Sequence, residues 1–235
     1  MSENQIAMKE AAGRAAVDAL VKSGMKIGLG TGSTAVFATR RVGELLAQGV
    51  LRDISAFPTS FQTEIECENL GIPWYSLNSH KLSGSLDLTI DGADEVSPEN
   101  FLTKGGGGAL LIEKIAAYAS ASYAIAVDES KLAGALGLSF PVPVEIVNEA
   151  RLTATKAIEK LGAAAKLREG IRKAGPVITD NGNLILDLTF SSPVKPDEVE
   201  LLLNQIPGVV ENGFFTRKRP VVFIARRDGT VEVRS

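Results

Sequence analysis

The chain has 235 residues, of which 45% are apolar and 23% are charged, and its formal net charge is −3. This length suits one large domain or a large and a small one, and the apolar content excludes a disordered chain. The weak negative charge gives no electrostatic reason to expect a nucleic acid or an anionic membrane as partner. No apolar run reaches the ~18 residues of a membrane span. The N-terminus is polar and acidic rather than a signal peptide, so we expect a cytoplasmic protein.

Cys67 and His80 are the only cysteine and the only histidine. One cysteine excludes an intramolecular disulfide, and the pair excludes a zinc site of the usual cysteine and histidine kind. We therefore expect no metal and no cofactor, with catalysis by carboxylates, lysines, hydroxyls and backbone amides. Cys67 is expected to be packed on a helix, and His80 to be exposed in a polar loop.

The first 130 residues alternate between short apolar runs and helical patterns. A helix is predicted over residues 2–23, with Ile6, Ala12, Ala16 and Leu20 on its apolar stripe and Gly24 as its stop. Strands are predicted at 25–29, 54–57, 86–90 and 123–127, and further helices end near 48 and span 60–70 and 109–120. This alternation predicts a doubly wound, mostly parallel sheet with helices on both faces.

The order of predicted strands and helices changes near Phe140. Strands at 141–147, 164–167, 184–190 and 209–212 and helices at 149–161 and 196–205 give the order β-α-β-β-α-β, which is typical of ferredoxin-like folds. A final hairpin, 220–225 and 231–233, is expected to return to the first sheet. We therefore predict an α/β fold with a Rossmann-like catalytic domain, residues 1–139 and 214–235, and a small ferredoxin-like α+β domain, residues 140–213.

A glycine loop, Gly28-Leu29-Gly30-Thr31-Gly32-Ser33-Thr34, follows the first predicted strand and opens a helix. Its free amides and three hydroxyls suit a phosphate or another anion. The alternative is a helix N-cap preceded by flexible glycines, and the strand-loop-helix context favours the anion. The loop is not a dinucleotide fingerprint, because Ser33 occupies the place of the third glycine, and it lacks the Gly-Lys-Ser/Thr of a P-loop.

A pair of aspartates, in Asp91-Gly92-Ala93-Asp94-Glu95, follows the strand predicted at 86–90. In open α/β sheets the carboxyl ends of strands face the ligand crevice, so both carboxylates can accept hydroxyl hydrogen bonds or move protons there. The alternative is an Asp-Gly turn with Asp94 as a helix cap. The motif alone does not decide between them.

A second glycine run, Lys104-Gly105-Gly106-Gly107-Gly108, leads directly into the helix predicted at 109–120. Glycine amides and an ammonium together can form an oxyanion site, and Glu113 lies about one turn into that helix. The alternatives are a flexible linker for the run and a solvated helix face for Glu113 and Lys114. A linker is disfavoured, because the run joins a strand and a helix of one domain and begins with a lysine.

Proton abstraction next to a carbonyl group is the chemistry that fits these residues. It needs a carboxylate base, donors for the developing enediolate oxygen, and an anion clamp that orients the substrate. No residue set indicates hydride transfer or a Schiff-base cofactor.

Four motifs together resemble those of type A ribose-5-phosphate isomerases. They are Gly28–Thr34, Asp91–Glu95, Lys104–Leu110 with Glu113, and Asp128-Glu129-Ser130-Lys131, and they occur in order at similar spacings. The C-terminal half is similar in its domain plan only. Many relatives have alanine where this chain has Gly108, and little consequence is expected because glycine removes no donor.

The resemblance implies an isomerase that interconverts ribose 5-phosphate and ribulose 5-phosphate without metal or cofactor, in the non-oxidative pentose phosphate pathway of carbohydrate metabolism. It implies that Glu113 moves the proton from C2 to C1, that Asp91 helps to open the furanose ring, that Lys104 stabilises the cis-enediolate, and that Asp94 positions hydroxyls. The substrate contacts that it implies are Lys9, Thr31, Gly32, Ser33, Thr34, Asp91, Gly92, Ala93, Asp94, Lys104, Gly105, Gly106, Gly107 and Lys131. Without the resemblance, Lys9 and Lys131 read as surface lysines.

Two other functions compete with this one. A non-catalytic sugar-phosphate sensor of the transcription-regulator type would need a DNA-binding helix-turn-helix and a basic face, which the sequence lacks. A coenzyme A transferase of related fold would use a glutamate as nucleophile, but would not explain paired aspartates beside two glycine loops. The resemblance also implies a homodimer or homotetramer.

Overall fold

The computed structural model describes residues 2–235 and divides them into two compact units. The first unit comprises the described residues up to Ala93, together with Ile112–Lys131 and Lys218–Ser235; the second comprises Asp94–Leu111 and Leu132–Arg217. Neither unit is continuous, because the chain passes between them after residues 93, 111, 131 and 217. No helix within residues 2–235 is long and apolar enough to cross a membrane.

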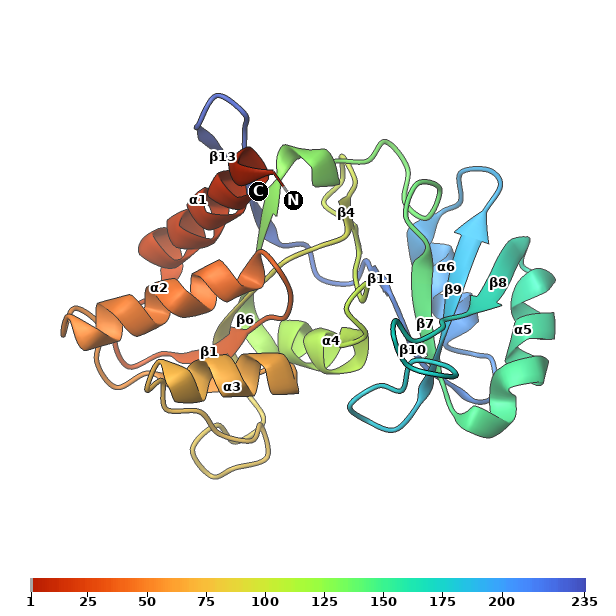
Figure 1. The fold of residues 1–235 in the computed structure, drawn as a ribbon, viewed down its shortest axis with the longest axis horizontal. Coiled ribbons are helices and arrows are strands. Elements are labelled where there is room, and N and C mark those ends of the chain that lie inside the picture. The colour runs from red at the N-terminus through yellow and green to blue at the C-terminus, as the bar shows by residue number, and fades with distance from the viewer. Residues whose placement is uncertain (1) are drawn as a thin grey trace. The chain divides into compact units, whose positions relative to one another are not determined.

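The first unit is built on a six-stranded sheet, and its order is β13-β12-β6-β3-β1-β2 (Figure 1). The strands are β1 (Lys26–Leu29), β2 (Ser55–Pro58), β3 (Leu86–Asp91), β6 (Ser120–Asp128), β12 (Val221–Ala225) and β13 (Val231–Arg234). All neighbours pair in parallel except β12 and β13, which form the antiparallel hairpin at the edge. The predicted parallel sheet and the return of the final hairpin to it are both confirmed.

Helices cover both faces of this sheet. They are α1 (Glu3–Leu20), α2 (Ala35–Ala47), α3 (Phe61–Asn69) and α4 (Leu110–Ala119), and the short 3-10 turn η1 (Glu129–Lys131) follows β6. Leu88 and Ile90 of β3 pack in the core with α1 and α2. Thr89 points the opposite way, as alternation along a strand requires, and its Oγ1 donates to the Ala116 carbonyl of α4 at 3.3 Å. The doubly wound arrangement predicted from the sequence is therefore present.

The first helix is shorter than predicted at both ends. Its N-terminus is closed by a capping box at Ser2, and it ends at Leu20 because Val21 is extended. The apolar stripe runs through Met8, Ala12 and Ala16, which repeat every four residues, and it leaves Ile6 42% exposed. The predicted placement of Ile6 on this stripe is therefore wrong.

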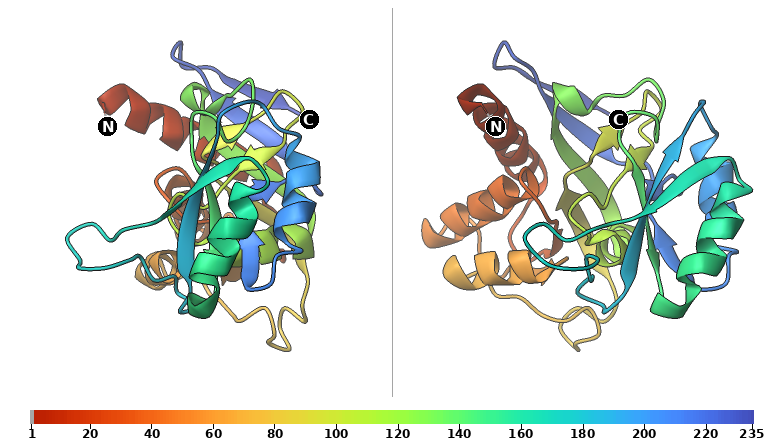
Figure 2. Two further views of the ribbon diagram at one scale, coloured as in Figure 1. Left: turned by 90° about the vertical axis from the view of Figure 1, so that its right-hand side faces the viewer. Right: turned by 45° about the vertical axis from the view of Figure 1, so that its right-hand side comes forward.

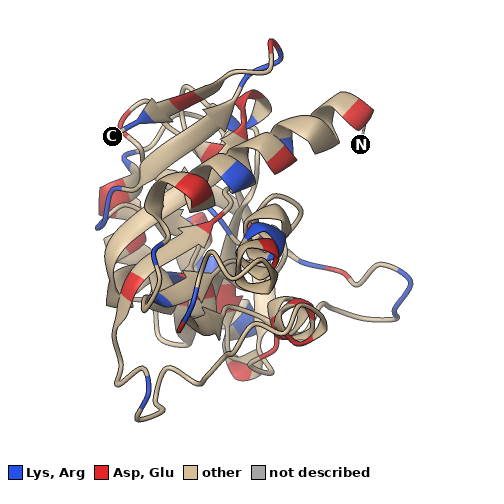
Figure 3. Cartoon of the chain, turned by 90° about the vertical axis from the view of Figure 1, so that its left-hand side faces the viewer, with Lys and Arg blue, Asp and Glu red and all other residues tan. Residues whose placement is uncertain are grey.

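Charged residues of both signs occur along α1 and α2 (Figure 3). Arg14 pairs with Glu44 at 2.9 Å and Arg41 pairs with Asp18 at 2.7 Å, so each pair joins the two helices. Three of the four side chains are 34–47% exposed, so these pairs add little to stability.

The second unit contains an antiparallel sheet of order β10-β7-β9-β8 (Figure 2). Its elements in chain order are β7 (Val142–Ile146), η2 (Asn148–Ala150), α5 (Arg151–Glu159), β8 (Ala163–Leu167), β9 (Leu184–Phe190), α6 (Pro196–Leu203) and β10 (Val209–Asn212). Val144 and Leu186 on the sheet, Ile158 on α5 and Leu203 on α6 belong to one core, so both helices lie on the same face. This β-α-β-β-α-β order with the last strand beside the first confirms the ferredoxin-like arrangement.

A three-stranded sheet, β11-β5-β4, was not predicted from the sequence. Its strands are β4 (Glu95–Val96), β5 (Leu102–Thr103) and β11 (Phe214–Phe215), and two residues are too few to show an alternating pattern. This sheet groups residues 94–111, 132–139 and 214–217 with the second unit, whereas the predicted division placed them in the first.

Phe214 joins this small sheet to the core of the second unit. It has no exposed surface, and its ring lies 6.1 Å from that of Phe190. We expect Phe214→Ala to lower the free energy of unfolding by about 3–5 kcal/mol, since it leaves a cavity in a closed core. Urea unfolding followed by circular dichroism measures this change. The matched control is Leu152→Ala on α5, where the side chain is 57% exposed; an equal loss in both variants would contradict the packing described here.

Candidate functional site

Two of the predicted motifs meet at the carboxyl edge of the first sheet. Strand β1 lies between β2 and β3 in the sheet. The next strand in the sequence, β2, is therefore on one side of β1, and β3 is on the other. The loop after β1 carries residues 30–34, and the turn after β3 carries Asp91. In open α/β sheets this reversal of strand order is where ligands bind, so the fold brings these residues to a favourable position.

Gly30 and Asp91 are in direct contact. A Cβ on Gly30 would lie 2.0 Å from Asp91 Oδ1 and 2.6 Å from its Cα, so glycine is needed there. Asp91 is fully buried, and its Oδ1 accepts hydrogen bonds from the amides of Thr31 at 3.1 Å and Gly92 at 2.7 Å. The loop and the carboxylate therefore hold each other in place.

The hydroxyl of Thr31 faces other hydroxyls. Its Oγ1 lies 2.7 Å from both Thr59 Oγ1 and Ser60 Oγ, and Thr63 Oγ1 donates to the Gly30 carbonyl at 2.9 Å. These groups follow β2, and sequence reasoning missed them. The signal was present in Pro58-Thr59-Ser60, because the carboxyl end of β2 lies beside that of β1. Thr31 therefore braces the loop through its side chain.

Lys9 contacts the same loop, and Lys131 lies close enough to affect the pKa of Lys9. Lys9 of α1 is 7% exposed, and its Nζ donates to Ser33 Oγ at 2.7 Å. Burial lowers the pKa of Lys9, the charge of Lys131 lowers it further, and the carboxylate of Asp128 raises it. Asp128 ends β6, and its Oδ1 accepts the Ser130 amide at 3.0 Å. The first unit thus gathers positive charge and a hydroxyl at Ser33, as an anion site requires.

Glu113 lies in the first turn of α4 and is only 4% exposed. The neighbouring Lys114 is 3% exposed. The two side chains therefore do not form a solvated helix face, which was the alternative left open by the sequence.

In the second unit, Asp94 and Lys104 are both held by backbone contacts. Asp94 Oδ2 accepts the Gly106 amide at 2.7 Å, so Asp94 anchors the glycine run and is not a helix cap. Lys104 is 2% exposed, and its Nζ lies 5.6 Å from the centre of the Phe215 ring. Its amide donates to the Gly213 carbonyl at 2.9 Å. The ammonium is therefore placed by a strand that the sequence did not reveal.

The glycine run lies on the helix-free face of the four-stranded sheet. A Cβ on Gly105 would meet Pro143 at 3.3 Å, and one on Gly108 would meet Ile185 at 3.4 Å. Pro143 on β7 and Ile185 on β9 alternate with the core residues of their strands, so their side chains point away from α5 and α6. Gly105 and Gly108 have φ of +98° and +86°, and the Gly108 amide donates to the Gly105 carbonyl at 2.9 Å. The run is a defined turn, not a flexible linker.

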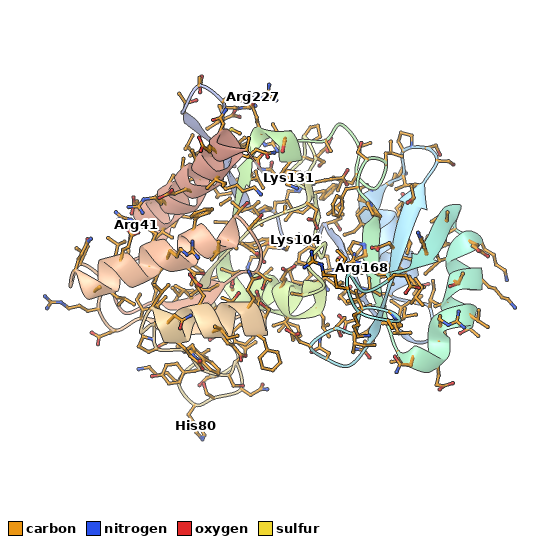
Figure 4. All side chains as sticks on the ribbon, viewed as in Figure 1. Arg41, His80, Lys104, Lys131, Arg168 and Arg227 are labelled. Carbon is orange, nitrogen blue, oxygen red and sulfur yellow. The ribbon has the colours of Figure 1, made fainter. Side chains whose placement is uncertain are left out.

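Cys67 and His80 lie where the sequence placed them. Cys67 is fully buried on α3, and desolvation raises the pKa of its thiol to about 12, so the thiolate is not formed at neutral pH. His80 is exposed in the loop before β3 (Figure 4). Within residues 2–235, no group of three or more His, Cys, Asp or Glu side chains is placed to hold a metal ion.

The contact between Gly30 and Asp91 predicts a strong effect of a single methyl group. We expect Gly30→Ala to lower the free energy of unfolding by about 1–3 kcal/mol, because the strands cannot separate without repacking. Gly134→Ala is the control, since a Cβ there meets no atom within 4 Å, and its expected effect is below about 0.5 kcal/mol. Urea unfolding compares the two variants; equal stability would show that β1 and β3 do not approach this closely.

Comparisons with known proteins agree with this geometry. The family described as ribose 5-phosphate isomerase A (phosphoriboisomerase A) matches residues 55–229. A protein of Treponema denticola with the name ribose-5-phosphate isomerase A is 53% identical over 232 residues, covering 96% of this chain and 97% of its own. One from Trichodesmium erythraeum is 44% identical, covering 94% and 92%.

Solved structures agree as well. A D-ribose-5-phosphate isomerase in complex with phospho-erythronic acid superposes with a TM-score of 0.91 and 40% identity, over 96% of each chain. The ribose 5-phosphate isomerase A of Methanocaldococcus jannaschii gives a TM-score of 0.89 and 42% identity, over 96% of this chain and 97% of its own. The chain therefore belongs to the ribose 5-phosphate isomerase A family.

Proposed function

We propose that this protein is an aldose-ketose isomerase that interconverts D-ribose 5-phosphate and D-ribulose 5-phosphate. The observation that carries the proposal is the buried carboxylate of Glu113, which lies in the first turn of α4, the helix that follows the Lys104–Gly108 run in the sequence. Family membership over nearly the whole chain supports the identity of the sugar phosphate. No metal and no cofactor enters the proposed reaction.

The phosphate is assigned to the loop after β1. Lys9, Ser33 and Lys131 provide two ammonium groups and a hydroxyl there. The backbone amides that begin α2 add the positive end of a helix dipole. Thr31 is assigned to holding this loop in place, because its hydroxyl contacts the hydroxyls of Thr59 and Ser60.

Proton transfer is assigned to carboxylates. In the proposed sequence, Asp91 assists opening of the furanose ring, and Glu113 removes the proton from C2 of the open-chain aldose. The electron pair of the broken C2–H bond forms the C1=C2 double bond of the cis-enediolate, and the C1 carbonyl oxygen takes up the negative charge. A proton passes from the C2 hydroxyl to the C1 oxygen, and Glu113 then returns its proton to C1, which leaves the carbonyl at C2. One carboxylate serves both steps because it is regenerated within a single turnover.

The developing negative charge is assigned to Lys104 and the glycine run. The Gly106 amide is taken by Asp94 and the Gly108 amide by the Gly105 carbonyl. Gly107 is exposed, and no acceptor for its amide is present within residues 2–235. We therefore assign the Gly107 amide, together with the Lys104 ammonium, to the enediolate. Asp94 would act mainly by fixing the run.

Three further properties are proposed, of which the assembly and the pathway follow from the family resemblance. A homodimer or homotetramer is the proposed assembly, and the cytoplasm the proposed compartment. The reaction would belong to the non-oxidative pentose phosphate pathway.

Heavy water offers the direct test of the activity. Ribose 5-phosphate incubated with the protein in heavy water, without added cofactor, should yield ribulose 5-phosphate with carbon-bound deuterium, because the base exchanges its proton with solvent. Nuclear magnetic resonance detects the label. Tight binding without exchange or product would favour a sensor. A covalent glutamyl thioester formed with an acyl-coenzyme A would favour a transferase.

Glu113→Gln tests the base. We expect turnover to fall about 10³- to 10⁴-fold, as loss of a general base predicts, while binding of the sugar phosphate persists. The matched control is Glu68→Gln on the exposed surface of α3, which should retain normal turnover. Steady-state kinetics and calorimetry of binding separate the two effects. Near-normal turnover of Glu113→Gln would assign the base to another residue.

A further inference from the structure

Arg168 is fixed to the centre of the four-stranded sheet. Its Nε donates to Asp187 Oδ2 at 2.8 Å and its Nη2 to Asp187 Oδ1 at 2.5 Å, which is a bidentate pair on β9. Its amide donates to the Ile185 carbonyl at 2.9 Å, and its carbonyl accepts the Val177 amide at 2.9 Å. The side chain is 15% exposed. Both its backbone and its guanidinium plane are thus set by a central strand.

The remaining nitrogen of Arg168 reaches the glycine run. Nη1 donates to the carbonyls of Gly105 and Gly106, both at 3.0 Å. The Gly105–Gly106 peptide is therefore held at both ends, by Arg168 at its oxygen and by Asp94 at its nitrogen. Figure 4 shows Arg168 beside Lys104, the first residue of the motif.

Packing closes the other sides of the same peptide. A Cβ on Gly105 would lie 2.7 Å from Leu110 Cβ, and one on Gly106 would lie 2.9 Å from Phe140 Cζ. Contacts on several sides therefore restrict the run, and Arg168 holds two of its carbonyls. A guanidinium suits this task because it presents several N–H groups in one rigid plane, whereas an ammonium is a point charge.

We propose that Arg168 is a positioning residue for the isomerase reaction, acting through the Lys104–Gly108 run on the donors that stabilise the enediolate. The inference rests on the proposed function. It goes beyond it, because the sequence motifs and the family resemblance assigned no role to Arg168, which lies more than 60 residues from the run. Without this clamp the two carbonyls are released and the Gly107 amide loses its fixed direction. The phosphate loop lies on the first unit and is untouched.

Arg168→Lys and Arg168→Met test the clamp, with Arg172→Ala, an exposed arginine of the following loop, as the control. We expect kcat to fall about 10- to 100-fold in both Arg168 variants, the range expected for a misplaced catalytic group, with KM within about threefold. Arg172→Ala should keep both constants. The lysine variant preserves the charge, so a full kcat in Arg168→Lys would overturn the clamp in favour of a purely electrostatic effect.

Hydrogen exchange supplies a readout that does not depend on activity. Residues 104–108 should exchange faster in Arg168→Lys, while the core strands β7 and β9 keep their protection. A lowered melting temperature with unchanged kcat and unchanged exchange in the run would show a merely structural pair with Asp187, and would overturn the inference. An inactive wild-type protein would instead contradict the proposed function, and the exchange of residues 104–108 would still decide whether Arg168 holds the run.

Discussion

The close approach of β1 and β3 at their carboxyl ends is the constraint on which the first unit depends. It requires that position 30 has no side chain, since Asp91 Oδ1 occupies the place of a Cβ. Because the same oxygen accepts two backbone amides, the strand contact also fixes the start of the glycine loop. The loop in turn presents Ser33 to Lys9. One steric requirement therefore sets a carboxylate, a hydroxyl and an ammonium together.

In the second unit, polar groups set the conformation of the glycine run. Its glycine run has few side chains with which to pack, so its conformation is set by Asp94 at an amide, by Arg168 at two carbonyls, and by the sheet beneath it. Hydrogen bonds to charged groups are stronger than those between neutral groups, which suits a turn that must keep one shape. Glycine is used here for the close approach of backbone to backbone, and its flexibility is removed by these contacts.

Much of the fold was predictable from the sequence, because it depends on local periodicity. The parallel sheet, the split β-α-β-β-α-β unit and the final hairpin each leave a pattern several residues long. The strands of two residues leave none, so β4, β5 and β11 were missed. Ile6 was misplaced, because it is as apolar as Met8 and only the packing of α1 decides between them.

Residues of the candidate site were predictable only where they belong to a sequence motif. The glycine loops and Asp91 were named from residue types at fixed spacing, and the burial of Glu113 removed an alternative that the sequence had left open. Thr59, Ser60 and Arg168 were not named, because each acts on residues far away in the sequence. A lone arginine after a strand has many ordinary uses, and its two carbonyl partners become visible only in three dimensions.

The discontinuity of the two units has a consequence for how such a protein can evolve. A segment of 132–217 would carry the split β-α-β-β-α-β sheet but would leave behind Asp94 and the glycine run, which belong to the same unit. A contiguous segment that carries the whole second unit, residues 94–217, must also carry residues 112–131, which belong to the first unit. An exchange of either unit between relatives by one contiguous segment therefore brings part of the other unit with it.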